Sequence, residues 1–351
     1  MSLISLLDEH EWSNLLTLFP KTSLDVYFTP EYATLYESGT NEGKVRCIKF
    51  ENSEGFALYP YIEREIPLEI TNGKKLKDIV TPYGYGGPVL TNRSQEFLRS
   101  FNNAVDDFFM DMGYISEFIR FHPILENHKL RDCTTSLVHR TFGVDFSKEE
   151  ADNLEFWHNS MKRGVKKAEK SGLEITVEPL GAKNLDTFVK IYNATMKRRN
   201  ARPYYFFSES YWSLMLSLGQ KGESILANVL YNGKVISSAI FLIWDRIYIH
   251  YHLGGSNEDY LNLRPNNYLF WNIEKWVAKN KFRILFLGGG VKESDGLERF
   301  KSGISNVSFD FYVGKKVFNE KIFHLLNERA KRLSEQNYDA DFFPPYRSVF
   351  R

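Results

Sequence analysis

The order of short strands and amphipathic helices repeats once along this chain, and this repeat constrains the fold more than any single motif. In the first half, residues 45–50 (VRCIKF) and 56–62 (FALYPYI) are predicted strands around the turn ENSEG. A glycine-rich loop, TPYGYGGP, follows. Residues 95–112 then carry apolar side chains at helical spacing, and residues 115–121 return as a strand.

The second half repeats this order. Asn232-Gly233 is a hairpin signal between two predicted strands, and a loop with Gly254 and Gly255 comes before the next helix. The predicted elements are strands at 224–231, 235–244 and 247–253, a helix at 267–279 and a strand at 282–287. We therefore expect an α/β protein of two units, residues 1–150 and 151–351, each with a mixed, mostly antiparallel sheet flanked by helices. A length of 351 residues also favours two domains.

The charge of the chain is balanced. Lys and Arg total 45 against 44 Asp and Glu, so no global field attracts DNA, and recognition of anions must be local. The start, MSLISLLDEHEW, turns acidic before a signal-peptide core forms, and no apolar run approaches the ~20 residues that span a bilayer. Cys47 and Cys133 show no metal-ligand or redox spacing. We expect a cytoplasmic protein without a transmembrane segment, a metal site or a DNA partner.

A basic amphipathic helix is predicted between the two halves, within residues 144–172. Its apolar side contains Trp157, Met161, Val165 and Ala168, and its basic side contains Lys162, Arg163, Lys166, Lys167 and Lys170. A solvated helix face would give the same pattern. The functional interpretation is a phosphate-binding ridge, in which Arg163 and Lys167 hold anionic substrate groups.

Three separated segments resemble the Fem-type peptidoglycan-bridge aminoacyltransferases. An acidic run, a Trp and KRGVKKAEKSG are similar to the linker and first helix of that family's second domain. LGGGV and DGLERFKSG resemble the end of that domain, and TPYGYGGP is similar to the glycine-rich loop of the first domain. These segments lie in matching order between Val45 and Val313. The resemblance implies two tandem GNAT-like domains and acyl transfer, in some members from aminoacyl-tRNA to the amino group of a cell-wall precursor.

The segment Gly254–Asn267 departs from the GNAT domains that use acetyl-CoA. Those domains place a glycine-rich pyrophosphate loop before the corresponding helix, so that backbone N–H groups meet phosphate. Here the segment reads GGSNEDYLNLRPNN, with acidic and bulky residues and a proline. We therefore expect no cofactor and aminoacyl-tRNA as the donor substrate, with acyl-CoA as the alternative donor.

Lys301 is the first candidate for catalysis. The resemblance to the Phe-Lys pair of the Fem-type enzymes implies that Phe300 and Lys301 lie at the substrate, where a cation stabilises an oxyanion or a phosphate. A surface lysine at the end of a short helix between Asp295 and Gly303 is the alternative. His252, at the end of the predicted strand IYIHYHL, is a candidate proton acceptor, although a strand histidine can equally be structural.

Two further groups are candidates for substrate binding. KRRNARPYYFF places Arg199 at a predicted helix end, followed by Tyr204 and Tyr205, and such side chains suit diphosphate oxygens and stacking on a sugar or base. Basic residues that complement the helix dipole would look the same. Tyr83 and Tyr85 in TPYGYGGP are candidates for contact with the acceptor, unless the loop simply packs on its own domain.

These features together predict an acyltransferase that moves an aminoacyl group from aminoacyl-tRNA to an amine of a cell-envelope or polysaccharide precursor. The expected acceptor is a nucleotide- or lipid-linked sugar or a muropeptide. One alternative is an acyl-CoA-dependent N-acyltransferase that acts on an amino sugar. The other is a non-catalytic GNAT-like module that binds tRNA or a glycan intermediate. The sequence leaves open the acyl group, the exact acceptor, the oligomeric state and the role of the C-terminal FFPPYRSVFR.

Overall fold

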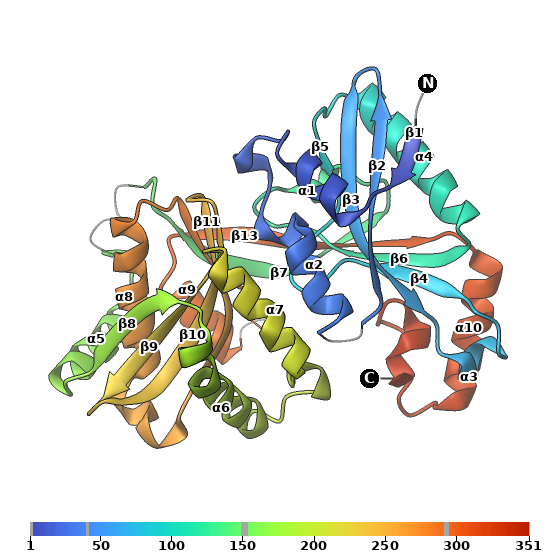
Figure 1. The fold of residues 1–351 in the computed structure, drawn as a ribbon. Helices are drawn as coiled ribbons and strands as arrows, with labels where there is room; N and C mark the ends of the chain where they lie inside the picture. Colours follow the sequence, from blue (N-terminus) through green and yellow to red (C-terminus); the bar gives the residue numbers. More distant parts are fainter. Residues whose placement is uncertain (1–2, 40–41, 149–153, 291–294, 351) are drawn as a thin grey trace. The chain divides into compact units, whose positions relative to one another are not determined.

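The computed structural model describes residues 3–39, 42–148, 154–290 and 295–350 (Figure 1). The chain divides into two compact units. The first unit is Met1–Val138 together with Phe311–Arg351, and the second unit is His139–Asp310. This division differs from the expected 1–150 and 151–351, because the C-terminal 41 residues return to the first unit.

The first unit contains a mixed sheet with the strand order β1-β2-β3-β4-β6-β13, and β5 pairs with β3. Its strands are β1 (Leu3–Leu6), β2 (Lys44–Asn52), β3 (Gly55–Glu65), β4 (Lys77–Val80), β5 (Val89–Leu90), β6 (Tyr114–Arg120) and the second part of β13 (Val307–Val317). Its helices include α1 (Glu9–Leu16), α2 (Pro30–Glu37), α3 (Leu68–Thr71), α4 (Gln95–Asp111) and α10 (Glu320–Leu333).

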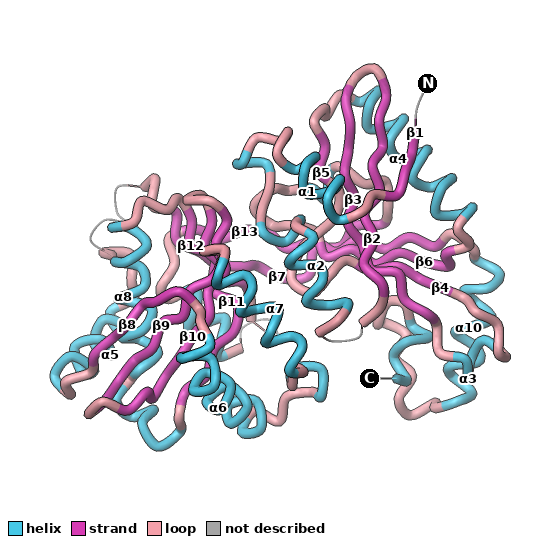
Figure 2. Tube along the Cα trace, viewed as in Figure 1, coloured by secondary structure: helices cyan, strands magenta, loops and turns pink. Residues whose placement is uncertain are grey.

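The second unit contains a sheet with the strand order β7-β12-β11-β10-β9-β8. Its strands are the second part of β7 (Thr134–Asp145), β8 (Glu174–Pro179), β9 (Ser224–Tyr231), β10 (Lys234–Trp244), β11 (Tyr248–Ser256) and β12 (Ile284–Gly288). Its helices include α5 (Asn159–Lys170), α6 (Ala182–Arg198), α7 (Glu209–Gln220), α8 (Pro265–Lys279) and α9 (Gly296–Ser302). Figure 2 distinguishes these helices and strands by colour.

The internal repeat extends to the pairing of the strands. From β1 to β13, the neighbours pair antiparallel three times, then parallel between β4 and β6, then antiparallel again. From β8 to β7, the same series occurs, with the parallel pair between β11 and β12. Helices α4 and α8 connect the two parallel pairs, as a parallel pair requires a crossover. The predicted mixed α/β fold with mostly antiparallel sheets is confirmed.

The helices of the second unit cover both faces of its sheet. Helices α5 and α8 pack on one face and α6 and α7 on the other, as Figure 1 shows. On the face that α5 covers, the core contains Trp157, Val165 and Phe270 of α8. This agrees with the apolar side that the sequence predicts for the basic helix. Trp157 itself precedes α5, and its indole Nε1 donates to Glu274 Oε2 at 2.6 Å. The acidic run predicted before this tryptophan falls largely on residues 149–153, which lie outside the described residues.

The C-terminal segment is joined to the first unit by a buried carboxylate. Asp78 of β4 is 1% exposed and accepts hydrogen bonds from Arg347 Nε at 2.6 Å, Arg64 Nε at 2.9 Å and Tyr346 Oη at 2.8 Å. Burial alone would raise the pKa of Asp78, but the two guanidinium groups hold this pKa below its ordinary value. These bonds, together with the pairing of β13 with β6, explain why residues 311–351 belong to the first unit.

A search of the described residues found no helix both long and apolar enough to cross a bilayer.

Arg347→Ala is expected to lower the free energy of unfolding by about 3 kcal/mol, because it leaves part of the charge on a buried carboxylate uncompensated. Chemical denaturation of the purified protein measures this change. Lys129→Ala is the control, since it removes an exposed ion pair with Glu126 and should cost less than about 1 kcal/mol. An Arg347→Ala effect no larger than that of the control would contradict this account.

The lowered pKa of Asp78 also implies a pH dependence. The contribution of the Asp78 carboxylate to the free energy of unfolding is present above the ordinary Asp pKa of about 3.9 and is lost at lower pH.

Candidate functional site

Lys301 is buried at the end of β12. Asp295 caps α9 by accepting a hydrogen bond from Glu298 N at 2.7 Å, and the helix ends at Gly303, as the sequence predicts. Within this short helix Lys301 is only 7% exposed, and its Nζ donates to the carbonyl oxygen of Gly289 at 2.7 Å. The same Nζ lies 5.6 Å from the ring centroid of Tyr251. The alternative of a surface lysine is therefore excluded.

The environment of Lys301 favours its neutral form. Burial lowers the pKa of Lys301 to about 7, and the negative charge of Asp295 offsets only part of this effect. A lysine with such a pKa can change its protonation state near neutral pH, as residues at functional sites often do. The charged ammonium group of Lys301 has three hydrogens. One donates to the carbonyl oxygen of Gly289, so two would remain for a ligand.

Phe300 and Tyr251 both pack against Phe270 in α8. The Phe300 ring lies 5.6 Å from that of Phe270 in α8, and the Tyr251 ring lies 5.0 Å from the same phenylalanine. A side chain at Gly254 would come within 2.5 Å of the Tyr251 hydroxyl, so this glycine makes room for the tyrosine. Phe300, predicted as a substrate-binding residue, thus packs against the core of the second unit. Sequence reasoning did not single out Tyr251 for the site.

His252 lies on the other face of β11 and is not brought together with Lys301. Tyr251 faces the core beneath α8, whereas His252 Nε2 lies 2.8 Å from the hydroxyl of Tyr211 in α7. A bulge lies at His252, since the pairing of β11 with β10 passes from Tyr251 directly to Leu253. Burial and the neighbouring His250 lower the pKa of His252 to about 3. A base this weak is poorly suited to accept a proton at neutral pH.

The end of α6 meets the end of β11. Arg198 Nη1 donates to the carbonyl oxygen of Ser256 at 3.0 Å. Its neighbour Arg199, the predicted ligand, is exposed at the C-cap of α6. Tyr204 is also exposed, and its ring packs edge-on against that of Tyr205 at 5.5 Å. These three predicted residues are thus accessible at one end of α6.

The basic face of α5 is exposed as predicted. Arg163 and Lys167 face solvent, and Val165 is buried between them in the sequence. A side chain at Gly164 would come within 2.8 Å of Asn267, because α5 packs closely against the first turn of α8. The buried face of α5 therefore packs against the start of α8, the helix that corresponds to the pyrophosphate-binding helix of CoA-dependent GNAT domains.

The loop before α8 is engaged with its own chain. Gly254 accommodates Tyr251, and Gly255 is packed so closely against α6 that a side chain there would come within 2.8 Å of Thr195 Oγ1. Asn266 Oδ1 accepts hydrogen bonds from Ser256 Oγ at 2.6 Å and Ser237 Oγ at 3.0 Å. The two glycines, predicted to lie in a loop, fall within β11 and serve internal packing.

In the first unit, Tyr83 and Tyr85 are half-buried in an aromatic cluster. Tyr32 Oη donates to the carbonyl oxygen of Tyr83 at 2.7 Å, and the ring of Tyr85 packs edge-on against that of Tyr27 at 5.2 Å. Gly84 between them has a φ of +85°, a conformation that favours glycine. Burial raises the pKa of Tyr85, so its hydroxyl stays protonated. These contacts are consistent with the alternative that the loop packs on its own domain. The rings of Tyr83 and Tyr85 are nevertheless partly exposed to solvent.

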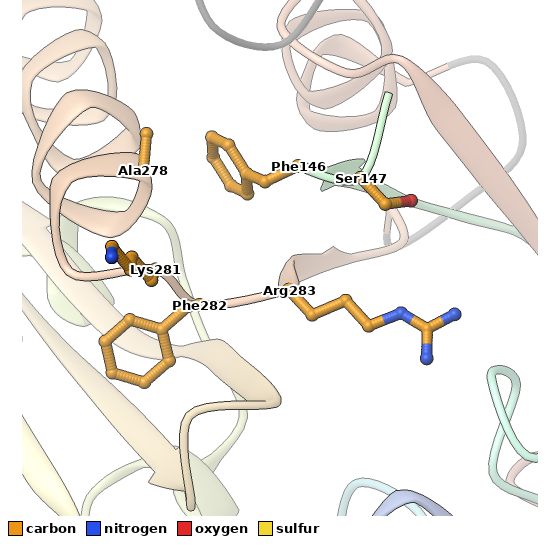
Figure 3. A pocket seen from close by; sticks show the side chains of 6 residues that line it. All are labelled: Phe146, Ser147, Ala278, Lys281, Phe282 and Arg283. Atoms are coloured by element: carbon orange, nitrogen blue, oxygen red, sulfur yellow. The ribbon is translucent and has the colours of Figure 1, made fainter. Parts of the chain in front are cut away.

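A pocket of about 330 Å³ in the second unit lies at the opposite end of β12 from Lys301 (Figure 3). Its lining residues are Phe146, Ser147, Ala278, Lys281, Phe282 and Arg283. Figure 3 shows the guanidinium of Arg283 extending away from the ring of Phe282. Since Phe282 and Arg283 precede β12 and Gly289 follows it, the pocket is separate from the surroundings of Lys301. The last residue of the LGGGV motif, Val291, lies outside the described residues.

The lowered pKa of Lys301 is directly measurable. In protein labelled with ¹³C at lysine Cε, we expect one NMR resonance to titrate near pH 7, whereas an ordinary lysine titrates near about 10.4. That resonance should be missing in Lys301→Arg and retained in the control Lys183→Arg, which changes an exposed lysine of α6. If every lysine resonance titrates above about pH 9, the site does not favour the neutral amine in the way its burial implies.

Comparison with known proteins agrees with this geometry. Residues 158–302 match the family model of the acetyltransferase (GNAT) domain, which supports an acyltransferase activity. No curated protein sequence matches the chain. The crystal structure of FemX is similar over 92% of this chain and 99% of its own, with a TM-score of 0.69 and 12% identity.

Two further structures share the fold. A tandem GNAT protein from the clavulanic acid biosynthesis pathway is similar over 90% of this chain and 98% of its own, with a TM-score of 0.52 and 8% identity. L-PGS from Bacillus licheniformis is similar over 87% of this chain and 96% of its own, with a TM-score of 0.51 and 14% identity. The chain therefore has the tandem GNAT fold that its resemblance to the Fem-type enzymes implies.

Proposed function

We propose that this protein is an acyltransferase that moves an aminoacyl group from aminoacyl-tRNA to an amine of a cell-envelope or polysaccharide precursor. The buried Lys301 at the ends of β11 and β12 is the observation that carries this proposal. The fold shared with FemX and the match of residues 158–302 to the GNAT model support it. We place the reaction in the cytoplasm, where charged tRNA is available.

In the proposed reaction, the amine attacks the carbonyl carbon of the aminoacyl ester. The carbonyl oxygen gains negative charge in the transition state, and a cation fixed beside it stabilises that charge. Lys301 can supply this cation in its protonated form, because the bond to Gly289 and the ring of Tyr251 fix the position of Nζ. A preorganised donor of this kind does not have to reorient during the reaction.

The packing around the start of α8 favours tRNA over CoA as the donor. Gly254 and Gly255, near the end of β11, contact Tyr251 and α6, and α5 packs against the first turn of α8 at Asn267. Backbone N–H groups at that turn are therefore poorly placed to receive a pyrophosphate. The exposed Arg163 and Lys167 offer an adjacent surface for the phosphates of a tRNA acceptor arm. Arg199, Tyr204 and Tyr205 are proposed to contact the anionic or sugar part of a substrate.

The acceptor is proposed to be a sugar-linked precursor that binds at the glycine-rich loop of the first unit. Tyr83 and Tyr85 are half-buried there, with apolar rings and hydroxyl groups that suit a sugar.

Acyl-CoA remains the alternative donor for an N-acyltransferase that acts on an amino sugar. The specific observations in its favour are the acetyltransferase description of the matching model and the likeness to a tandem GNAT protein whose structure is described by reference to AcCoA.

Transfer of radiolabelled amino acid from charged tRNA to amino-sugar nucleotides or muropeptides tests the proposal. We expect transfer by the unmodified protein, and Lys301→Ala should lower turnover about 100-fold to 1000-fold, because it removes the cation beside the oxyanion. Lys183→Ala, at an exposed position on α6, is the matched control and should leave turnover unchanged. The same assay with acetyl-CoA distinguishes the alternative donor. The proposal fails if neither donor supports transfer and Lys301→Ala binds the precursors as the parent protein does, an outcome that would favour a non-catalytic binding module.

Removal of the basic side chains of α5 tests the donor site separately. The double variant Arg163→Ala/Lys167→Ala should bind tRNA more weakly, and the slope of log K against log salt should fall by about one for each phosphate that α5 no longer neutralises. Lys331→Ala/Arg332→Ala removes the same charge from the end of α10 and serves as the control. Equal salt slopes for the two double variants would show that α5 does not contact the tRNA backbone.

A further inference from the structure

One buried side chain, Asn127, binds the backbone of the glycine-rich loop TPYGYGGP. Its Nδ2 donates to the carbonyl oxygen of Gly86 at 2.7 Å and to that of Pro88 at 3.2 Å. Its Oδ1 accepts a hydrogen bond from His122 N at 2.8 Å, and Asn127 is only 1% exposed. A carbonyl oxygen only accepts and a backbone N–H only donates, so these partners fix the orientation of the amide. Both hydrogens of the amide nitrogen are therefore used by the loop.

The loop approaches Asn127 so closely that a side chain on the loop would not fit. Gly87 has a φ of +96°, which favours glycine, and a Cβ at this position would come within 2.9 Å of Asn127 Nδ2. The preceding Gly86 donates from its N–H to the carbonyl oxygen of Arg120 at 2.7 Å. The part of the loop after Tyr85 is thus fixed by Asn127 and by the end of β6.

Asn127 also belongs to a buried chain of polar groups. His122 Nδ1 accepts a hydrogen bond from Leu125 N at 3.3 Å, so the ring proton is on Nε2, which donates to Asp25 Oδ2 at 2.9 Å. Asp25 Oδ1 in turn accepts from Val26 N at 2.7 Å, directly before Tyr27. His122 and Asp25 are both fully buried. The chain therefore extends from the glycine-rich loop to the segment that carries Tyr27.

Both ends of this chain meet at the ring of Tyr85. The Tyr85 ring packs edge-on against that of Tyr27 at 5.2 Å, and each of these two rings lies 5.8 Å from the imidazole of His122. Tyr85 also directly precedes Gly86, whose carbonyl oxygen Asn127 binds. The position of Tyr85 thus depends on Asn127 through the backbone and on His122 through ring packing.

We propose that Asn127 is a positioning residue for the acceptor, because it fixes the glycine-rich loop in its binding conformation before the acceptor arrives. This inference rests on the proposed function, which assigns acceptor binding to Tyr83 and Tyr85. A loop that is already ordered loses little conformational entropy when a ligand binds. Without Asn127, part of the binding free energy of the acceptor would be spent on ordering the loop. Asn127 itself is too deeply buried to touch the substrate.

Asn127→Leu tests this role, because leucine is similar in size and removes all three hydrogen bonds. With UDP-glucosamine or a soluble muropeptide as acceptor, we expect KM for the acceptor to rise about 10-fold with kcat unchanged, the pattern of lost uniform binding. The KM for charged tRNA should stay as in the parent protein. Calorimetric titration of the same two acceptors should show the same weakening without turnover.

Asn102→Leu is the matched control. Asn102 is also buried, and its Nδ2 also donates to two carbonyl oxygens, those of Leu98 at 2.9 Å and Leu130 at 3.0 Å. Its Oδ1 accepts from Arg131 Nη1 and Asp132 N. None of these groups belongs to the glycine-rich loop, so Asn102→Leu should lower stability without changing KM for the acceptor. Thermal unfolding of both variants checks that their losses of stability are comparable.

Gly87→Ala disturbs the same contact from the side of the loop. The new Cβ would press on Asn127 Nδ2, so KM for the acceptor should rise as in Asn127→Leu, and the two effects should not add in the double variant. Hydrogen–deuterium exchange gives a readout that needs no acceptor. We expect the amides of residues 83–87 to exchange faster in Asn127→Leu and Gly87→Ala than in Asn102→Leu. If Asn127→Leu does not fold, Gly87→Ala decides.

The outcomes separate this inference from the proposed function. If the parent protein transfers acyl groups and the Asn127→Leu and Asn102→Leu variants share one acceptor KM, Asn127 does not position the acceptor, while the proposed function stands. A fall in kcat with an unchanged acceptor KM would also overturn the inference. If the parent neither binds nor acylates UDP-glucosamine or the muropeptide, the assignment of the acceptor fails and the inference fails with it.

Discussion

Parallel hydrogen bonding between β11 and β12 determines where the candidate site forms. The paired segments are 248–250 and 284–286, and the carboxyl ends of two parallel strands meet at one edge of a sheet. Tyr251 follows the first segment and Gly289 follows the second, so both reach that edge. Lys301 contacts both of them, through the Tyr251 ring and the Gly289 carbonyl oxygen. The burial of Lys301 and the position of its amine both depend on this pair of strands.

Each unit contains a buried ionisable group whose protonation is governed by burial and by its partners. Asp78 has two guanidinium groups and a hydroxyl as partners, which lower its pKa and keep it charged. Lys301 has a backbone carbonyl, an aromatic ring and the more distant Asp295, and burial lowers its pKa to about 7. A buried charge with full compensation is stable, whereas one with partial compensation changes its protonation near neutral pH. The first arrangement holds the C-terminal segment in place, and the second suits a reacting group.

The same strand order occurs in both units, so corresponding segments of the two units can be compared. In both, three antiparallel pairings precede one parallel pairing, and a helix connects the parallel strands. The first unit uses the loop after its parallel strand β4 for an aromatic cluster around Tyr83 and Tyr85. In the second unit, Gly254 and Gly255 lie near the end of β11 and serve internal packing. Similar scaffolds thus carry different local packing at corresponding positions.

The sequence by itself determined the elements whose signals are local. Local patterns predicted strands β2, β3, β6 and β9 to β12, helices α4 and α8, the basic face of α5 and the short helix between Asp295 and Gly303, but not β1, β4, β5, β7, β8 or β13. Order across three motifs then predicted the tandem GNAT fold, which the similar structures confirm. Only the tertiary structure decided that residues 311–351 return to the first unit, because Arg347 and Asp78 lie 269 positions apart in the sequence. The contact of His252 with Tyr211 in α7 and the contact of His139 with Gly289 also escaped prediction. The physical reason is common to all three: local patterns fix each strand, but register and long-range packing fix which side chains meet.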